Sequence, residues 1–400
     1  MSYSYRTNKA RSFSGGRPRN NFSKSRSNRG FRGDYIDPSR FVKAATFTEA
    51  DAYEPINKFS DFALAPLLQA NLKAVGYVVP SPIQDQAIPL GLVGSDVIGI
   101  ASTGTGKTAA FALPVLQKLM SESDSYAIII APTRELAQQI EDECRVLAKG
   151  SGLTGTLLIG GTNMSGQLRD LRNNPRIVIG TPGRIKDHLE RGSLRLQKFN
   201  AIVLDEVDRM LDMGFVNDVT TILSHASPTR QSFFFSATMD ARVRTLIDNF
   251  TNNPVTISLK ASAASENVHQ DVVRFQTNSD KIEKLHELLI LEHVTKVIVF
   301  DETQRSVERL SNELASRGFS AESIHGGKSQ GQRQRALNKF KRNEIKVLVA
   351  TDVAARGIDV SDISHVVNYS IPKVYDDYIH RIGRAGRAGQ IGYALTFVAH

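Results

Sequence analysis

The 400-residue sequence has one cysteine, Cys144, and no tryptophan. A single cysteine excludes an internal disulfide bond and a zinc site built from cysteines. No apolar run approaches the roughly 20 residues that span a membrane, and the start, Met1–Arg6, lacks the apolar core of a signal peptide. Hydrophobic residues make up 41% of the chain, which suits two cored domains. We therefore expect a cytoplasmic protein with no membrane partner.

Acidic residues are absent from residues 1–33, which carry nine Lys or Arg and so account for the whole formal net charge of +9. The same stretch is rich in Ser, Asn and Gly, with scattered Tyr and Phe. Such a segment cannot bury a core, so we expect a disordered basic tail over residues 1–45. Arg with interleaved aromatics is typical of phosphate attraction and base stacking without sequence choice, although a merely solubilising tail has the same composition.

Residues 101–108 form a Gly-rich loop that ends in Lys107-Thr108 and begins with Ala101 where the general P-loop pattern has Gly. The apolar run 96–100 before it predicts a strand, and residues 109–120 after it predict an amphipathic helix. In that order, the backbone and helix N-terminus would cradle nucleoside triphosphate phosphates, Lys107 would neutralise charge, and Thr108 would ligate Mg²⁺. The predicted cofactor-binding loop is Ser102, Thr103, Gly104, Thr105, Gly106, Lys107 and Thr108. The alternative is a Gly-rich turn without a ligand.

A second predicted strand, residues 201–204, ends in the acidic group Asp205-Glu206-Val207-Asp208. In an ATPase, Asp205 would hold Mg²⁺ through water, and Glu206 would orient or activate the attacking water. Taken alone, the group would be an ordinary solvated turn. Together with the P-loop it predicts the second half of a phosphate site.

Short apolar runs alternate with helical stretches along the rest of the chain, which predicts an α/β fold with parallel sheets. The strands expected after the loop are 127–131, 156–159, 176–179, 201–204 and 232–235. A polar stretch, 260–266, predicts a linker after the run 255–258. The strands expected beyond it are 296–300, 320–324, 345–350, 365–368 and 393–397. We therefore expect domains at 46–262 and 263–400.

From Phe59 onward the sequence resembles DEAD-box ATP-dependent RNA helicases, in a bacterial-looking form whose box reads Asp-Glu-Val-Asp and whose tail is rich in Arg, Gly and Ser. The resemblance rests on motifs in the family's order: Phe59 with 76–77 and 80–84, then 101–108, 132–137, 160–161, 181–184, 205–208, 236–238, 330–333, 350–359 and 378–387. It implies two tandem RecA-like domains with an ATP cleft between them.

The resemblance also implies roles around the nucleotide. Phe59 would stack on adenine and Gln84 would bond its edge, within a motif spanning 59–84, which implies ATP rather than GTP. Asp359 would bind the ribose hydroxyls. The predicted catalytic residues are Lys107, Asp205, Glu206, Asp208, Ser236, Thr238, His380, Arg384 and Arg387, with Thr108 and Asp205 at the metal and the last two arginines as fingers that act when the domains close.

The motifs that would face RNA lie at carboxyl ends of expected strands, where open α/β sheets bind ligands. The residues concerned are Pro132, Thr133, Arg134, Gly160, Gly161, Thr181, Pro182, Gly183, Arg184, Gln330, Arg333 and Thr351. Taken one at a time, each of these motifs would be interpreted as a turn or a helix cap. The family reads RNA through phosphates and 2′-hydroxyls, so the expected partner is single-stranded or short duplex RNA without sequence preference.

Three departures from the family pattern bear on these expectations. Val207 stands where the family usually has Ala, and we expect its side chain to pack in the core rather than to face the metal. Gly327 stands where the family often has Asp. The sequence ends at His400, directly after the last expected strand, where the family usually adds at least one further helix, so we expect either a second domain shortened at its end or a last helix that lies outside this sequence.

The function predicted from the sequence is an ATP-dependent RNA helicase that clamps, bends and locally unwinds short duplexes or remodels ribonucleoprotein. An ATP-gated RNA-binding scaffold with little unwinding is the alternative, and an ATPase acting on DNA ranks lower.

We expect removal of residues 1–33 to weaken RNA binding and flatten its salt dependence, with ATP hydrolysis retained, because each lost phosphate contact lowers the log-log salt slope by about 0.7 on a single strand. Anisotropy titrations of a labelled RNA between about 50 and 200 mM salt would measure this. An unchanged slope would favour the solubilising tail.

Overall fold

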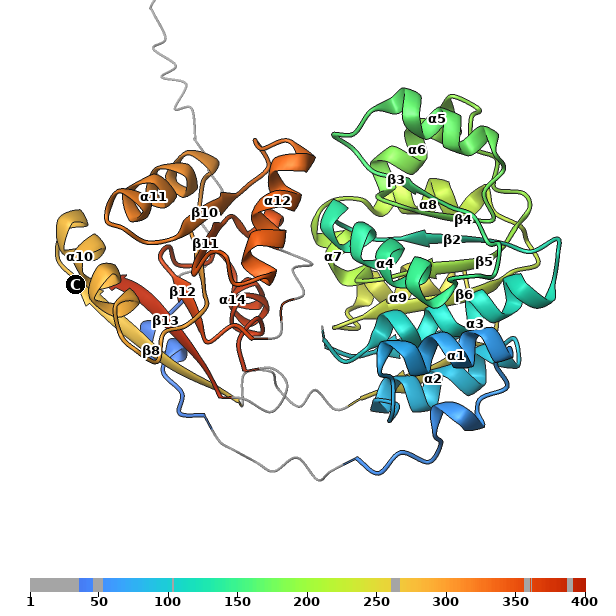
Figure 1. Cartoon of the computed structure of the whole chain (residues 1–400), viewed down its shortest axis with the longest axis horizontal. Helices are drawn as coiled ribbons and strands as arrows, with labels where there is room; N and C mark the ends of the chain where they lie inside the picture. The colour runs from blue at the N-terminus through green and yellow to red at the C-terminus, as the bar shows by residue number, and fades with distance from the viewer. Residues whose placement is uncertain are drawn as a thin grey trace, which may run out of the picture. The chain divides into compact units, whose positions relative to one another are not determined.

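The computed structural model describes residues 36–45, 53–102, 104–259, 267–355, 360, 362–386 and 391–400. Within these residues the chain forms two parallel β-sheets, each covered by helices on both faces (Figure 1). The α/β architecture expected from the sequence is confirmed. None of the helices in the described ranges combines the length and the apolar character needed to cross a membrane.

The first sheet has seven parallel strands in the order β3-β4-β2-β5-β6-β1-β7. Their bounds are β1 Val97–Ile100, β2 Tyr126–Ile130, β3 Gly155–Leu158, β4 Ile177–Gly180, β5 Phe199–Leu204, β6 Gln231–Ser236 and β7 Val255–Ser258. The inner strands are nearly continuous runs of buried apolar residues, as a parallel sheet covered on both faces requires. Every strand expected for this domain is present within two residues of its predicted position.

Two sets of helices cover this sheet. One face carries α1 Pro66–Val75, α2 Pro82–Leu92, α3 Lys107–Ser121 and α4 Arg134–Leu147, preceded by a 3₁₀ turn, η2 Phe59–Asp61. The other carries α6 Pro182–Glu190, α7 Val207–Asp212, α8 Val216–Ser224 and α9 Ala241–Asp248, and α5 Met164–Arg172 follows β3. At Gly99 in β1 an added Cβ would overlap the ring of Phe235, so only glycine allows β1 and β6 to approach this closely.

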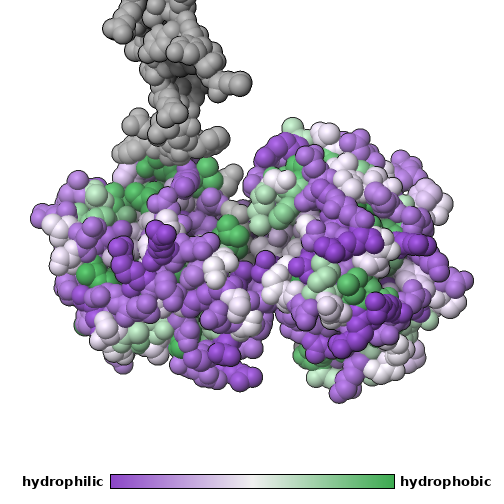
Figure 2. All heavy atoms as spheres, turned by 90° about the horizontal axis from the view of Figure 1, so that it is seen from above, coloured by the Kyte–Doolittle hydropathy of each residue, from purple (hydrophilic) through white to green (hydrophobic). Residues whose placement is uncertain are grey.

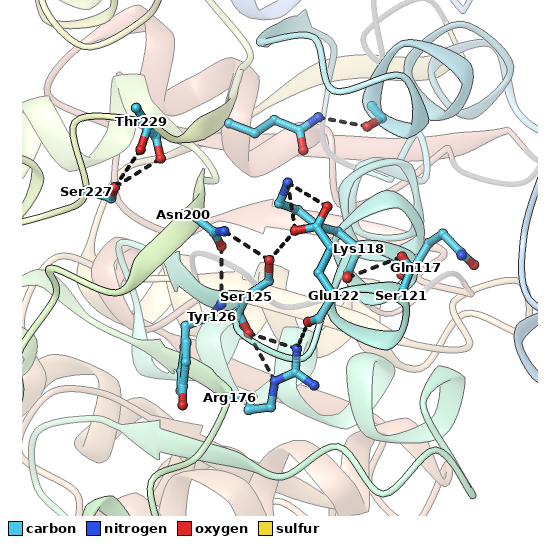
Figure 3. Close-up of polar contacts among 12 residues, drawn as sticks. Gln117, Lys118, Ser121, Glu122, Ser125, Tyr126, Arg176, Asn200, Ser227 and Thr229 are labelled. Carbon is cyan, nitrogen blue, oxygen red and sulfur yellow. Dashed lines mark hydrogen bonds and ion pairs between the residues drawn. The ribbon is translucent and has the colours of Figure 1, made fainter.

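A polar network fixes the amino-terminal edge of this sheet (Figure 3). Ser125 donates to Glu122 at the end of α3, and its own Oγ accepts from Asn200 Nδ2 at 2.9 Å. Asn200 Oδ1 also accepts from Tyr126 N at 3.2 Å, and Arg176 Nε donates to Ser125 O at 3.0 Å. The starts of β2, β4 and β5 are thereby tied together, which aligns their opposite, carboxyl ends.

The second sheet has six parallel strands in the order β10-β11-β9-β12-β13-β8. Their bounds are β8 Val268–Phe275, β9 Val297–Phe300, β10 Ala321–Ile324, β11 Val347–Ala350, β12 His365–Asn368 and β13 Gly392–Ala399. β8, which pairs with β13 over eight residues, was not predicted, because its half-buried edge sequence lacks the apolar run that identified the others. The boundary predicted at residues 262 and 263 lies outside the described residues.

Helices also cover both faces of the second sheet. One face carries α10 Asn278–Leu289 and α11 Gln304–Ser316. The other carries α12 Gln330–Lys341, the short α13 Asp352–Ala355 and α14 Tyr375–Ile382. The surface seen in Figure 2 is mostly hydrophilic, with separate small hydrophobic patches.

The predicted disordered tail was wrong over residues 36–45, and residues 1–35 lie outside the described residues. Pro38–Phe41 forms a 3₁₀ turn, η1, whose first residue follows the cap Asp37. Ile36 and Phe41 are 6% and 0% exposed in the core of the second domain. The prediction rested on the charge pattern of the tail, which gave no sign that these two apolar residues would be buried.

The ring of His365 stacks on Tyr393, with centroids 4.9 Å apart, and His293 lies beside both. Burial, together with smaller contributions from the charges of His293 and Lys346, lowers the pKa of His365 to about 4. Because the unfolded side chain titrates near pH 6.5, the neutral form stabilises the fold, and this stability is lost as pH falls from about 6.5 to about 4.

We expect His365→Phe, which keeps a stacking ring, to reduce the loss of unfolding free energy between pH 7 and pH 5 by about 1–2 kcal/mol. Urea unfolding at the two pH values measures this, and exposed His225→Phe controls for removal of a histidine. An equal pH dependence in wild type and His365→Phe would contradict the expectation.

Candidate functional site

The P-loop lies between the end of β1 and the start of α3, as predicted. Gly104 and Gly106 have positive φ angles of 83° and 90°, which glycine adopts without strain. Lys107 is only 5% exposed and its Nζ donates to Ala101 O at 3.0 Å, so the lysine closes the loop from inside. Thr105 Oγ1 donates to Ser102 O at 2.8 Å. The loop thus leads into the N-terminus of a 15-residue helix, and such a helix end binds anions. Thr103 lies outside the described residues.

The predicted adenine motif is joined directly to this loop. Gln84 Oε1 accepts from Ser81 N at 2.9 Å, and its Nε2 donates to Gly106 O at 3.0 Å. Ser81 Oγ donates to Thr105 O at 2.7 Å. Phe59 is 4% exposed, with its ring edge-on to Tyr77 at 5.4 Å. Both side chains are engaged within the protein, so adenine stacking by Phe59 and bonding by Gln84 remain predictions.

The acidic group follows the end of β5 and is buried: Asp205, Glu206 and Asp208 are 2%, 4% and 6% exposed. Burial raises the pKa of Asp205 to about 6, and Lys107 opposes this rise while Glu206 and Asp208 add to it. A buried carboxylate beside other carboxylates is stabilised by a cation, and the Thr108 hydroxyl at the adjacent P-loop is the oxygen ligand that Mg²⁺ prefers. The donor set therefore fits Mg²⁺.

Glu206 has two unusual features. It has the left-handed backbone conformation, φ 54° and ψ 55°, which is strained for a residue other than glycine or asparagine. Within the described part of the chain its buried Oε2 accepts no hydrogen bond, and Arg209 Nε lies 3.5 Å away. The adjacent Val207 is fully buried in the apolar core, which confirms that its side chain packs there.

Asp208 joins the acidic group to the loop after β6. Its Oδ2 accepts from Ala237 N at 3.1 Å, from Thr238 N at 2.9 Å and from Thr238 Oγ1 at 3.1 Å. Asp208 N in turn donates to Ser236 Oγ at 3.3 Å. Three of the predicted catalytic residues, Asp208, Ser236 and Thr238, are therefore in direct contact.

Most residues predicted to face RNA line one cavity of about 520 Å³. Its lining includes Pro132, Thr133, Arg134, Gly160, Thr181, Gly183, Arg184 and Arg333. The guanidinium of Arg134 covers the backbone of Gly160 and Gly161, where added Cβ atoms would collide with it. Glycine at both positions thus lets a cationic side chain lie against the floor of the cavity.

A buried ion pair reaches the same cavity from α12. Arg333 Nη2 lies 2.7 Å from Glu135 Oε2, and the two side chains are 8% and 1% exposed. Burial raises the pKa of Glu135, and Arg333 opposes the rise. Gln330, at the start of α12, is 8% exposed.

Sequence reasoning missed a buried network that supports the Gly160–Gly161 turn. Gln167 Nε2 donates to Ile159 O at 2.9 Å and to Thr162 Oγ1 at 2.6 Å, and its Oε1 lies 3.0 Å from His188 Nε2. Burial lowers the pKa of His188, which keeps the ring neutral, and its Nδ1 lies 2.9 Å from Ser193 Oγ. A buried Gln and His on neighbouring helices were the only signal, and their pairing depends on tertiary structure.

In the second domain, Arg381 belongs to the predicted arginine motif, but its structural role was not predicted: it holds that motif in place. Its Nε and Nη2 donate to Asp352 at 2.5 and 2.8 Å, and its Nη1 donates to Asn368 Oδ1 and to Ser370 O. His380 and Arg384 line the same small cavity as Arg381 and Asp352. Thr351, 9% exposed, follows the end of β11 and precedes Asp352. Arg387 and Asp359 lie outside the described residues.

Gly327, the departure from the family pattern, lies in a turn after His325. Its N donates to His325 Nδ1 at 3.2 Å, and an added Cβ would approach Gln304 Oε1 to 2.6 Å. A side chain there would have to displace the end of Gln304, so glycine fits this turn.

Two α/β domains with a P-loop and buried carboxylates at one sheet edge define a tandem RecA-like protein. Residues 81–246 match the family model described as DEAD/DEAH box helicase, and residues 280–389 match that of the helicase conserved C-terminal domain. The chain is 44% identical to DEAD-box ATP-dependent RNA helicase CshA of Bacillus licheniformis, over 85% of this chain and 70% of that protein. CshA of Bacillus subtilis is also 44% identical, over 85% and 69%.

Matches to solved structures agree with this family assignment. Mss116p bound to single-stranded RNA and AMP-PNP matches with a TM-score of 0.78 and 29% identity, covering 87% of this chain and 76% of that one. Saccharomyces cerevisiae Dbp5 bound to RNA and ADP BeF3 matches with a TM-score of 0.75 and 32% identity, covering 86% and 89%. The chain belongs to the DEAD-box ATP-dependent RNA helicase family.

We expect Gln167→Leu to weaken RNA binding severalfold while leaving ATP binding unchanged, because it releases the Gly160–Gly161 turn without touching the P-loop. Leaving the buried His188 Nε2 without its partner should also lower the unfolding free energy by about 1–3 kcal/mol. RNA anisotropy, nucleotide titration and thermal unfolding test this, with exposed Gln197→Leu as the matched control. Unchanged RNA affinity despite lower stability would show that the turn does not depend on this network.

Proposed function

We propose that this protein hydrolyses ATP in an RNA-dependent reaction and uses the cycle to clamp, bend and locally unwind short RNA duplexes or to remodel ribonucleoprotein. The observation that carries the proposal is the convergence, at one sheet edge, of the P-loop with Asp205, Glu206 and Asp208, beside a cavity floored by Arg134. The names of the similar proteins support the same activity.

The P-loop and the acidic group would divide the work on ATP. Backbone N–H groups at the start of α3 and Lys107 would hold the phosphates. Thr108 and Asp205 would hold Mg²⁺, which when bound supplies positive charge opposite the phosphate oxygens. Glu206 Oε2, which is buried and accepts no hydrogen bond within the described residues, would orient the attacking water and accept its proton. Arg384 and Arg387 would stabilise charge on the γ-phosphate as arginine fingers.

The cavity beside the acidic group would bind the RNA backbone. The N-termini of α4 and α6 end at this cavity, so their N–H groups and Arg134 and Arg184 would bind phosphates. Such contacts read backbone shape rather than base identity, so sequence preference would be weak.

Asp208 would couple the γ-phosphate site to the loop after β6. Because its carboxylate accepts three hydrogen bonds from the Ala237–Thr238 turn, a change at the γ-phosphate site would be transmitted to the loop after β6. If ATP and RNA both favour one closed state, each raises the affinity for the other by the same factor. Independent binding in paired titrations would exclude such a clamp.

We expect single-stranded RNA to stimulate ATP hydrolysis, and Glu206→Gln to reduce the stimulated rate by about 10²–10⁴-fold with ATP binding retained, because the amide cannot accept the proton. Steady-state hydrolysis with and without RNA measures this, and exposed Glu190→Gln is the matched control. A DNA oligomer of the same sequence distinguishes an RNA-dependent enzyme from a DNA-dependent one. RNA binding without turnover in wild type would favour the scaffold alternative.

A further inference from the structure

Residues 36–44, which we call the clasp, are held on the second domain although they precede the first domain in sequence. Ile36 and Phe41 are part of the second domain's buried core. Lys43 and Gln270 exchange both backbone hydrogen bonds, at 3.0 and 2.8 Å, in an antiparallel bridge. Because β8 is the last strand in the order of its sheet, the clasp covers the edge of the sheet.

The clasp packs against α14, the helix that begins the arginine motif. The ring of Phe41 lies 4.7 Å from that of Tyr378, and the Arg40 guanidinium lies 3.8 Å over the ring of Tyr375. Tyr378 Oη donates to the Gln270 side chain at 2.9 Å, which joins helix and bridge. The helical repeat places Tyr375, Tyr378 and Ile382 on one side, with His380 on the opposite side.

The chain after the clasp is fixed to the first domain by one carboxylate. Asp85 in α2, 2% exposed, accepts from Tyr53 Oη at 2.5 Å, Ile56 N at 2.8 Å, and Asn57 N and Nδ2 at 3.0 and 2.7 Å. Burial alone would raise the pKa of Asp85, but these hydrogen bonds outweigh it and lower the pKa. We call this group the anchor. It lies one residue from Gln84, which contacts the P-loop.

The clasp and the anchor are therefore built attachments on different domains, separated only by residues 46–52. Eight virtual bonds join Ala45 to Tyr53, so the two ends can be at most roughly 28 Å apart. The domains are also joined by the chain between β7 and β8. Two short connections restrict domain separation more than one does.

We propose that the clasp is a second tether between the two domains, one that keeps α14 and its arginines within reach of the P-loop. The tether acts by effective concentration: a shorter connection raises the local concentration of one domain around the other. In terms of the proposed function, on which this part rests, it favours the closed state that binds ATP and RNA together.

Lengthening the tether tests the proposal without disturbing either attachment. A flexible Gly/Ser insert of about 30 residues within 46–52 leaves the clasp and the anchor intact. The same insert between residues 34 and 35 is the matched control, because it does not change the distance along the chain from clasp to anchor. Arg40→Ala combined with Lys43→Pro is a second variant, which undocks the clasp by removing the cation–π contact and one bridge hydrogen bond.

Energy transfer between dyes on the two domains gives a readout that does not depend on ATP hydrolysis. Cysteines introduced as Lys73→Cys in α1 and Glu287→Cys in α10, both exposed, accept the dyes. The native Cys144 is fully buried, and burial raises its thiol pKa, so it does not compete. Without ligands, the insert within 46–52 and the undocked variant should show lower and broader transfer than wild type and the control. Identical distributions would overturn the proposal.

Hydrolysis provides the second readout. The insert within 46–52 should raise both the KM for ATP and the half-saturating RNA concentration about threefold to tenfold, with kcat within about twofold of wild type. Unchanged constants for this insert, together with a lower kcat in the undocked variant, would overturn the tether and reduce the clasp to a support for α14. If wild type shows no RNA-stimulated hydrolysis, the proposed function fails, and the energy-transfer result still decides the tether.

Discussion

The alignment of parallel strands is the constraint on which this structure depends. In a parallel sheet every strand ends at the same edge, so loops distant in sequence are brought together without direct contacts between their parent helices. The ends of β1, β5 and β6 supply the P-loop, the acidic group and the Ser236–Thr238 turn. The ends of β2, β3 and β4 supply the cavity floor. Because the Ser125 network fixes the opposite edge, a slip of one strand would move a functional loop away from its partners.

Charge burial at that edge has an energetic cost, which the protein offsets with internal hydrogen bonds. Lys107, Asp205, Glu206 and Asp208 are all under 7% exposed, in a place where isolated charges are strongly disfavoured. Lys107 bonds the loop backbone and Asp208 bonds a turn, so both stay oriented. Asp205, whose pKa is raised to about 6, accepts one hydrogen bond, from Glu206 N at 2.9 Å, and Glu206 Oε2 accepts none within the described residues. These two carboxylates, with the fewest hydrogen bonds of the group, are those proposed to meet metal and water.

The features of the fold and the site that the sequence predicted are those with a signature in a short stretch of neighbouring residues. Buried strands and the P-loop have short-range signatures, so their positions were predicted within two residues. β8 was missed because its half-buried edge sequence lacks an apolar run. The clasp was missed because two apolar residues next to the basic segment 1–33 leave no periodic pattern. The pairing of Gln167 with His188 and of Arg381 with Asp352 spans 21 and 29 residues, and nothing local to either partner indicates it. The resemblance located the site, and packing determined how each side chain lies.

The backbone at Glu206 has a consequence for how this protein can change. Asn174, Asn253 and Asn343 also have positive φ, but asparagine tolerates that region, whereas glutamate carries a strain of about 1–3 kcal/mol. Replacement of Glu206 by Gly would relieve the strain while removing the carboxylate. Stability and turnover thus oppose each other at a single position. Screens for thermostable variants of this chain, if they ignore hydrolysis, would select inactive proteins there first.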